Sequence, residues 1–167
     1  IQKKELQKEE RKWGNKTNKT NKTRKTRKKN KTNKTTGQWT TQLGEQLVYD
    51  VLKLNGENPR EVKKKGGFKP DWETDKYIYE VKTSSWWVDG SAGEKVLGTY
   101  IKYQDIPEIY GKPLRIVCVA NQEYELTHGK TKYFGKITKK TKLVLDLAKS
   151  WGIEYVKFSD LIINDNL

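Results

Sequence analysis

Two acidic residues and one lysine occur at a spacing that suits metal-dependent chemistry. Asp71 follows Pro70, and Glu80, Val81 and Lys82 come after eight further residues. A pair of carboxylates with few other ligands suits Mg²⁺, a hard cation that keeps several waters and contacts substrate phosphates. Such a cation lowers the pKa of a bound water and offsets the charge that develops on a phosphate under attack. The lysine can orient the attacking water or stabilise that charge.

The residues around Glu80 predict the strand that positions this group. Residues 77 to 83 are rich in tyrosine, isoleucine and valine, which favours a strand. Because side chains alternate between the faces of a strand, Glu80 and Lys82 share one face, about 6.5 Å apart by strand rise. The tyrosine and valine side chains beside them face the core on the other side. A hairpin that returns from Asp71 would bring its carboxylate beside Glu80, so that two acids and an ammonium converge.

A repeat of apolar residues upstream predicts a helix from about Gln38 to just before Gly56, with Thr40 or Thr41 as its N-cap. The apolar residues that recur at helical spacing are Leu43, Leu47, Val48, Val51, Leu52 and Leu54. Glu45 lies among these apolar neighbours. We expect Glu45 either to reach the metal site or to anchor a water that binds the metal.

The remaining segments predict an α/β fold, a mixed sheet flanked by helices. Hairpin connections are expected at Gly66 with Gly67 and at Thr74 with Asp75. A helix is expected near residues 100–110, interrupted or ended near Pro107, and residues 86–98 have a loop-like composition. Further extended segments are expected at residues 61–65, 71–74, 114–120 and 154–158, a second clear helix at 137–151, and a turn or helix at 161–163.

This arrangement resembles the PD-(D/E)XK nuclease superfamily, the fold shared by many type II restriction endonucleases, resolvases and some homing endonucleases. The resemblance extends over roughly residues 38 to 120 and implies a restriction-endonuclease-like core. The residues that carry it are Pro70, Asp71, Glu80, Val81 and Lys82, preceded by a helix that contains Glu45.

The resemblance implies a magnesium-dependent endodeoxyribonuclease that leaves a 5′-phosphate and a 3′-hydroxyl. Asp71, Glu80 and Val81 are then the expected metal-site residues, with Mn²⁺ as an acceptable substitute for Mg²⁺. Lys82 is the expected water-orienting group, and Glu45 corresponds to the family's helical acid, which varies in position. Sequence-specific, restriction-type cleavage of duplex DNA by a homodimer is the first expectation. A homing endonuclease or a junction resolvase with the same chemistry remains an alternative.

The segment after Lys82 leaves the predicted catalytic strand and is expected to lie along the DNA. Its hydroxyl groups and lysines would contact phosphates, and its tryptophans would wedge against or stack on bases. The tryptophans are equally expected to cap the core. The expected DNA-binding residues are Ser84, Ser85, Trp86, Trp87, Lys95, Lys102 and Gln104.

The net charge of +14 lies mostly in the first 36 residues, which hold fifteen Lys and Arg against three Glu, a net of +12. Residues 37–167 hold twenty basic and eighteen acidic side chains, a net of +2, and form the predicted nuclease-like domain. Because residues 15–36 contain no apolar side chain, residues 1–36 are expected to be a disordered tail. The tail would bind DNA phosphates regardless of sequence, or its residues 24–29 would act as a nuclear localisation signal.

The composition excludes several classes of protein and site. The single cysteine, Cys118, excludes internal disulfides and cysteine-based zinc sites, and its apolar surroundings predict a buried thiol. The single histidine, His128, excludes histidine-rich nuclease sites and lies in a turn-like setting. Neither a membrane span nor a signal peptide is predicted, so an intracellular location, cytoplasmic or nuclear, is expected. The alternative to an enzyme is a DNA-binding protein in which Glu80 and Lys82 form an ion pair on a solvated sheet face.

Overall fold

The computed structural model of the chain describes residues 38–84 and 92–163. The predicted tail and the predicted DNA-binding residues Ser85, Trp86 and Trp87 lie outside these residues. In the described part, no helix has the length and apolar character needed to cross a membrane. The elements in chain order are α2 (Gln38–Leu54), β1 (Arg60–Glu61), β2 (Trp72–Glu73), β3 (Ile78–Ser84), α3 (Ala92–Leu97), α4 (Thr99–Lys102), α5 (Ile106–Tyr110), β4 (Leu114–Ala120), α6 (Asn121–His128), α7 (Lys139–Ser150), β5 (Ile153–Lys157) and α8 (Phe158–Ile163).

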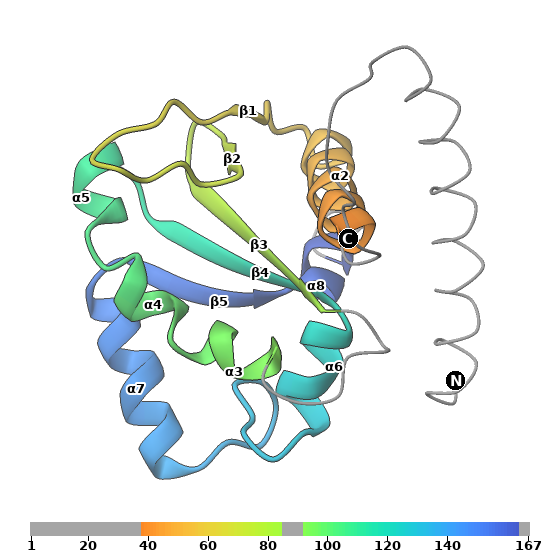
Figure 1. Cartoon of the computed structure of the whole chain (residues 1–167), viewed down its shortest axis with the longest axis vertical. Coiled ribbons are helices and arrows are strands. Elements are labelled where there is room, and N and C mark those ends of the chain that lie inside the picture. Colours follow the sequence, from red (N-terminus) through yellow and green to blue (C-terminus); the bar gives the residue numbers. More distant parts are fainter. Residues whose placement is uncertain (1–37, 85–91, 164–167) are drawn as a thin grey trace, which may run out of the picture.

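The strands of the described residues form one five-stranded mixed sheet in the order β1-β2-β3-β4-β5 (Figure 1). The first three strands are antiparallel neighbours, whereas β4 and β5 run parallel to β3. Parallel neighbours need a crossover between them, and the segments that carry α3–α5 and α6–α7 provide it. The predicted α/β class, a mixed sheet flanked by helices, is confirmed.

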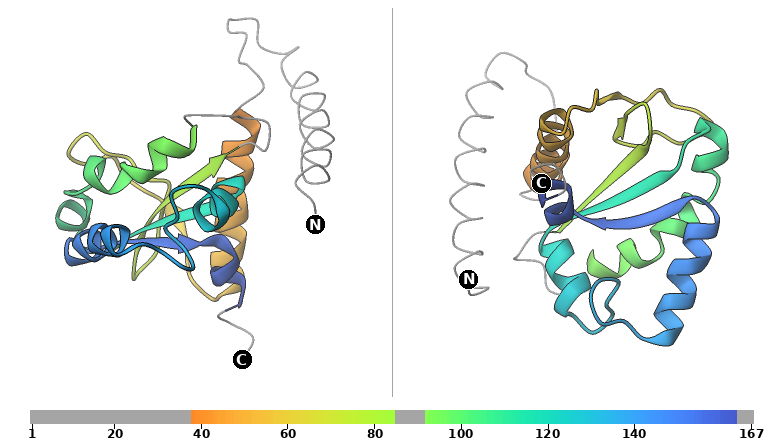
Figure 2. Two further views of the ribbon diagram at one scale, coloured as in Figure 1. Left: turned by 90° about the horizontal axis from the view of Figure 1, so that it is seen from below. Right: turned by 180° about the vertical axis from the view of Figure 1, so that it is seen from behind.

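Helices cover both faces of the sheet (Figure 2). On one face α2 and α8 pack over β3 and β4 through Val48, Leu52, Tyr79, Val81, Val117, Val119 and Leu161. On the other face α3, α5, α6 and α7 pack against β3, β4 and β5 through a core that includes Ile78, Val96, Ile106, Ile116, Leu126, Ala148 and Ile153. Strand β4 is buried on both faces, which explains its continuous apolar sequence. Cys118 of β4 is fully buried, as predicted, and burial raises the pKa of its thiol.

Several predicted boundaries are wrong. Thr40 and Thr41 lie inside α2, so neither is its N-cap. The extended segment predicted at residues 61–65 is shorter, because β1 covers only Arg60–Glu61. The helix predicted near residues 100–110 is interrupted, as expected, but before Pro107, which leaves two short helices, α4 and α5. Pro107 lies in the first turn of α5 and does not end a helix, because a proline there lacks only an N–H that has no partner inside the helix.

Two helices were not predicted. Helix α3 occupies part of the segment that has a loop-like composition, and α6 follows β4 directly. The sequence of α6 has weak apolar periodicity, yet Asn121, Gln122 and Leu126 are buried, so tertiary packing stabilises this helix. His128 is the last residue of α6 and is exposed, where its ring stacks on Tyr124 at 4.6 Å.

Candidate active site

The β2–β3 hairpin places Asp71 beside Glu80, since the register of the two strands makes these residues neighbours. The N–H of Asp71 donates to the carbonyl oxygen of Tyr79 at 3.1 Å, just beyond the last register pair of Trp72 with Tyr79. The carboxylate of Asp71 accepts the N–H of Val81 at 2.7 Å. These two bonds fix the Asp71 carboxylate against the strand that carries Glu80 and Lys82.

Glu80 and Lys82 form a close ion pair on one face of β3. The Nζ atom of Lys82 lies 2.6 Å from Oε1 of Glu80. This face is opposite to the one on which Tyr79 and Val81 pack, as the alternation of strand side chains predicts. The Glu80 side chain is only 8% exposed and that of Lys82 is 29% exposed. The pair therefore does not lie on a solvated sheet face.

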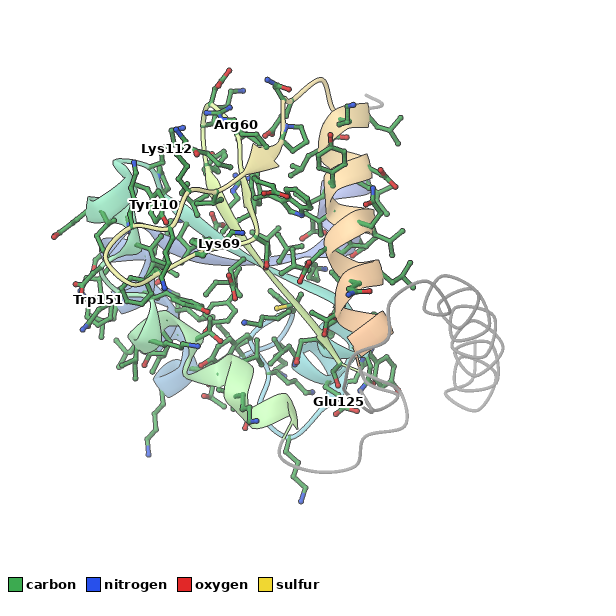
Figure 3. All side chains as sticks on the ribbon, turned by 45° about the horizontal axis from the view of Figure 1, so that its top comes forward. Arg60, Lys69, Tyr110, Lys112, Glu125 and Trp151 are labelled. Atoms are coloured by element: carbon green, nitrogen blue, oxygen red, sulfur yellow. The ribbon has the colours of Figure 1, made fainter. Side chains whose placement is uncertain are left out.

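Helix α2 brings Glu45 to the same place. The helix lies directly on β3 at Gly44, where a Cβ atom would overlap with Cγ2 of Thr83. The indole N–H of Trp72 donates to the carbonyl oxygen of Glu45 at 2.9 Å and ties α2 to β2. Figure 3 looks onto this end of the molecule, with α2 on one side, the segment that contains Lys69 on the other, and β3 between them. We call Glu45, Asp71, Glu80 and Lys82 the acid–lysine group.

Negative charge is in excess within this group. Burial and then the charge of Glu80 raise the pKa of Asp71 to about 7, although the N–H of Val81 lowers it. Burial and Glu80 also raise the pKa of Glu45, although Lys82 lowers it. Three carboxyl groups thus act on one another while a single ammonium offsets them. A divalent cation would supply the missing positive charge.

The donor set fits Mg²⁺. Asp71 and Glu80 supply hard carboxylate oxygens, and Glu45 is a third acid nearby. The side chain of Val81 is aliphatic and buried against α2. Its backbone carbonyl oxygen is therefore the one atom of this residue that could be a ligand. In residues 38–84 and 92–163, no three His, Cys, Asp or Glu side chains form a complete metal-binding group. Mg²⁺ is commonly held by one or two carboxylates together with waters and substrate phosphates.

Tyr103, which follows α4, contacts Glu80, and the sequence did not predict this contact. Its hydroxyl donates to Oε1 of Glu80 at 3.0 Å, and the ammonium of Lys82 lies 5.6 Å from its ring centroid. Burial, followed by the charge of Glu80, raises the pKa of the Tyr103 hydroxyl, which therefore remains a hydrogen-bond donor. The one signal in the sequence was its place between Lys102 and Gln104, both predicted to contact DNA.

The other predicted DNA-binding residues are more scattered. Lys95 is exposed on α3 and Lys102 is exposed on α4. Gln104 is exposed but lies in the turn between α4 and α5, not on a helix as expected. Ser84 is 8% exposed and its hydroxyl accepts a hydrogen bond from Asn121 at 3.2 Å, which places it in the interior. Its position gives no support to the expected phosphate contact.

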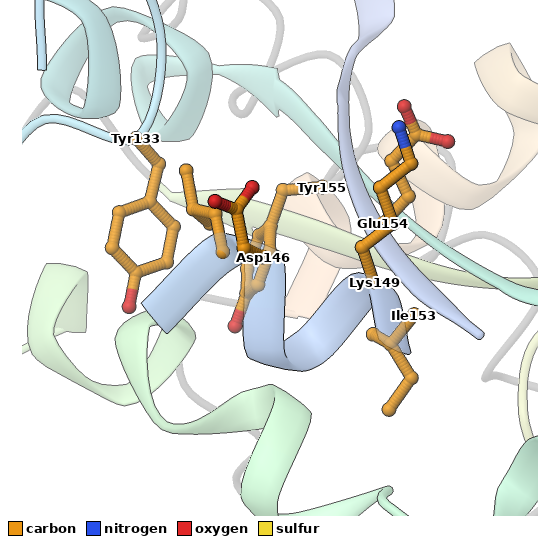
Figure 4. Close-up of a pocket in the computed structure, with 7 residues that line it drawn as sticks. Tyr133, Asp146, Lys149, Ile153, Glu154 and Tyr155 are labelled. Carbon is orange, nitrogen blue, oxygen red and sulfur yellow. The ribbon is translucent and has the colours of Figure 1, made fainter. Parts of the chain in front are cut away.

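A hollow of about 160 Å³ lies between α7 and β5, away from the acid–lysine group (Figure 4). Its lining residues are Tyr133, Leu145, Asp146, Lys149, Ile153, Glu154 and Tyr155, none of which is a predicted site residue. One of its acids, Asp146, is paired with Lys142 at 3.1 Å. The hollow therefore has no part in the chemistry predicted from the sequence.

Comparisons of the chain with protein-family models, with curated proteins and with solved structures find no match. A function for this chain must therefore be argued from the acid–lysine group and its surroundings.

Proposed function

We propose that the chain is a magnesium-dependent endodeoxyribonuclease whose catalytic residues are Asp71, Glu80 and Lys82, with Glu45 as a further acid. The observation that carries the proposal is the position of Asp71 beside Glu80, with the Lys82 ammonium 2.6 Å from Glu80. These residues come from a hairpin, and α2 adds Glu45 from a distant part of the sequence. Metal-dependent hydrolysis of a phosphodiester uses these elements: oxygen ligands for a hard cation and a fixed cation beside the reacting phosphate.

Each residue has a distinct part in the proposed reaction. Asp71 and Glu80 would hold Mg²⁺, with the Val81 carbonyl oxygen as an additional ligand. When bound, this ion would supply an activated water and offset charge on the phosphate. Lys82 would orient the attacking water or hold the negative charge that develops on the phosphate. Glu45 would anchor a water at the edge of the site.

The burial of the group favours a functional role over a structural one. An exposed Glu–Lys pair contributes little to stability, and a buried one often no more than apolar side chains of the same volume would. Here the pair is largely buried, and a third carboxyl group with a raised pKa lies beside it. Unfavourable arrangements of this kind are concentrated at functional sites. Mn²⁺ should replace Mg²⁺, because it accepts the same oxygen ligands.

The finer assignment follows the sequence resemblance. We assign the chain a restriction-endonuclease-like core that acts on duplex DNA. A homodimer would cleave the DNA at a specific sequence and leave 5′-phosphate and 3′-hydroxyl ends. A homing endonuclease or junction resolvase would use the same residues. The alternative from another class is a DNA-binding protein without catalysis, in which the Lys82–Glu80 ion pair is structural.

The test is incubation of the purified full chain with a large phage DNA, with Mg²⁺ and with EDTA. We expect cleavage only with Mg²⁺, and loss of cleavage in the variants Asp71→Ala and Lys82→Ala. Discrete fragments would indicate a restriction-type enzyme and a smear a non-specific nuclease. DNA that stays intact, or cleavage that survives both substitutions, would refute the catalytic assignment.

A further inference from the structure

A cluster of lysines lies on the segment that leads to Asp71. Residues 63–69 contain four of the twenty basic residues of residues 37–167 and no acid. The four lysines, Lys63, Lys64, Lys65 and Lys69, are all exposed, and none has an ion-pair partner in the part of the chain that the structure describes. We call residues 63–69 the lysine hairpin. Four cations within seven residues give this surface a local positive charge that attracts polyanions.

The lysine hairpin has a defined conformation. The backbone N–H groups of Lys65 and Phe68 each donate to the other residue's carbonyl oxygen at 2.9 Å. Gly66 and Gly67 between them have positive φ angles of 55° and 83°, which a tight two-residue hairpin turn of type I′ requires. The turn therefore fixes the backbone that carries the lysines, so that no ordering of the backbone is needed when they bind.

Helix α5 anchors this hairpin to the body. The Tyr110 hydroxyl contacts the carbonyl oxygens of Lys63 and Phe68 at 2.7 and 3.0 Å. The Lys65 ammonium lies 5.2 Å from the Tyr110 ring centroid. In Figure 1 the loop between β1 and β2 runs out to α5, and Figure 3 shows Lys69 and Tyr110 at this end of the molecule. The lysines thus belong to a fixed surface and not to a free loop.

The hairpin also adjoins the acid–lysine group. The ring of Phe68 meets the ring of Tyr103 at 5.8 Å, and the Tyr103 hydroxyl donates to Glu80. Lys69 is two residues before Asp71, so at most about 7 Å of chain separates them. Each DNA strand carries a phosphate about every 3.4 Å along the duplex. With DNA bound at Asp71, the Lys69 ammonium would therefore lie near phosphates within a few nucleotides of the phosphodiester bond to be cut.

We propose that the lysine hairpin binds the phosphate backbone of duplex DNA and sets the position of the strand relative to the acid–lysine group. The position of the strand rests on the proposed nuclease function, whereas DNA binding by the hairpin does not. The surface is specific for polyanion backbone and not for sequence, because lysines act on phosphates as point charges. Sequence discrimination, where it exists, belongs to other residues.

The test compares two triple variants of the full chain. Lys63→Gln/Lys64→Gln/Lys69→Gln neutralises the hairpin, and Lys136→Gln/Lys139→Gln/Lys140→Gln neutralises three exposed lysines at the start of α7, at the opposite end of the molecule (Figure 1). Binding to a labelled duplex is followed by fluorescence anisotropy in EDTA over a range of salt concentrations, so that no metal-dependent cleavage interferes. Each phosphate contact contributes about 0.9 to the slope of log affinity against log salt.

We expect the hairpin variant to bind roughly 10–100-fold more weakly at moderate salt, with a slope smaller by about 2 to 3, and the α7 variant to match the unmodified chain. A direct readout is acetylation of lysine amines, located by mass spectrometry with and without duplex. Bound DNA should protect Lys63, Lys64 and Lys69, and leave Lys136, Lys139 and Lys140 reactive.

Three results would overturn the proposal. They are equal losses of DNA affinity in both variants, equal protection from acetylation at both lysine clusters, and a full chain that does not bind duplex in EDTA. The nuclease assay is scored separately. Protection of the hairpin in a chain that does not cut DNA would refute the proposed catalysis and keep the hairpin as a DNA-binding surface. Mg²⁺-dependent cleavage with unchanged binding in the hairpin variant would refute the hairpin proposal alone.

Discussion

At the scale of single residues, Asp71 is held in a position that opposes its own ionisation. Burial and the charge of Glu80 raise its pKa to about 7 from an ordinary value of 3.8. A carboxyl group whose pKa is raised on folding costs no stability at low pH, where it is protonated in both states. The cost grows as the pH rises from about 4 to about 7, and above that it is complete. The metal-free protein should therefore lose stability over this range.

Asp71→Asn should stabilise the metal-free chain at pH 8 and have no such effect near pH 4. The asparagine oxygen can still accept the N–H of Val81, while the charge is removed. Each kcal/mol gained should raise Tm by about 3 °C, which thermal unfolding at the two pH values measures. Asp75→Asn is the control, since Asp75 is exposed and paired with Arg60 at 3.1 Å. Addition of Mg²⁺ should raise the Tm of the unmodified chain and of Asp75→Asn, but not that of Asp71→Asn. A variant less stable than the unmodified chain at pH 8 would contradict the charge repulsion inferred here.

Tyr103→Phe should weaken metal binding without unfolding the chain. The substitution removes the hydroxyl that orients Glu80 and keeps the ring beside Lys82. Loss of a group that orients a metal ligand typically costs about 10–100-fold in metal affinity or activity, so the Mg²⁺ concentration for half-maximal cleavage should rise about tenfold. Tyr133→Phe is the matched control, because its hydroxyl donates to the carbonyl oxygen of Leu97 at 2.9 Å, outside the site. The same Mg²⁺ dependence in both variants would assign Tyr103 a structural role only.

At the scale of elements, the approach of α2 to β3 determines where Glu45 lies. The contact occurs at Gly44, which has no side chain and leaves room for Thr83. A larger residue at this point would push the helix away from the strand that carries Glu80 and Lys82. The geometry of the group therefore depends on one small residue in a helix interior, where glycine is otherwise unfavourable.

Gly44→Ala should destabilise the chain by about 1–3 kcal/mol through overpacking, although alanine favours the helix by up to about 1 kcal/mol. Thr83→Ser removes the methyl group that would overlap, so the double variant should regain most of the loss. Urea denaturation of the two single variants and the double variant measures the coupling. Gly98→Ala is the control, because a Cβ there meets no atom within 4 Å. Equal stability of Gly44→Ala and Gly98→Ala would show that the contact is unimportant.

The sequence predicted the arrangement of Asp71, Glu80 and Lys82 better than it predicted the elements around them. Alternation along β3 was enough to place Glu80 and Lys82 on one face, and the hairpin signal placed Asp71. Tyr103 could not be found in this way, because its contact with Glu80 joins residues 23 apart in the sequence. Helix α6 was missed because its buried residues include the polar Asn121 and Gln122 beside Leu126, which leaves no clear apolar repeat. Pro107 was expected to interrupt or end a helix; the interruption lies just before it, because proline fits well in the first turn of the helix that follows.

At the scale of the whole molecule, charge and predicted chemistry occupy different parts of the chain. Residues 1–36 carry a net charge of +12 and residues 37–167 a net of +2. The lysine hairpin concentrates part of the positive charge of residues 37–167 beside the acid–lysine group. Affinity for DNA in general should therefore come mainly from the first 36 residues, and placement of the strand from the hairpin.

Deletion of residues 1–36 should weaken DNA binding at low salt and reduce its salt dependence, because up to fifteen cations are lost. Metal-dependent cleavage should survive, since none of the acid–lysine residues lies in this segment. Anisotropy and cleavage assays on the full and the shortened chain measure the two effects. A shortened chain that folds, as judged by circular dichroism, but no longer cuts DNA would contradict this division.

The most direct test of the central claim compares two lysines that form equally close ion pairs with acids of the same sheet. Lys82 lies 2.6 Å from Glu80, and Lys112 lies 2.6 Å from Glu73. The measurement is the single-turnover rate of DNA cleavage in Mg²⁺ by Lys82→Met and by Lys112→Met. If Lys82 acts on the reacting phosphate or water, its loss should lower the rate at least about 100-fold, and Lys112→Met should cleave like the unmodified chain. Equal rates in the two variants would contradict the assignment of Asp71, Glu80 and Lys82 as a catalytic site.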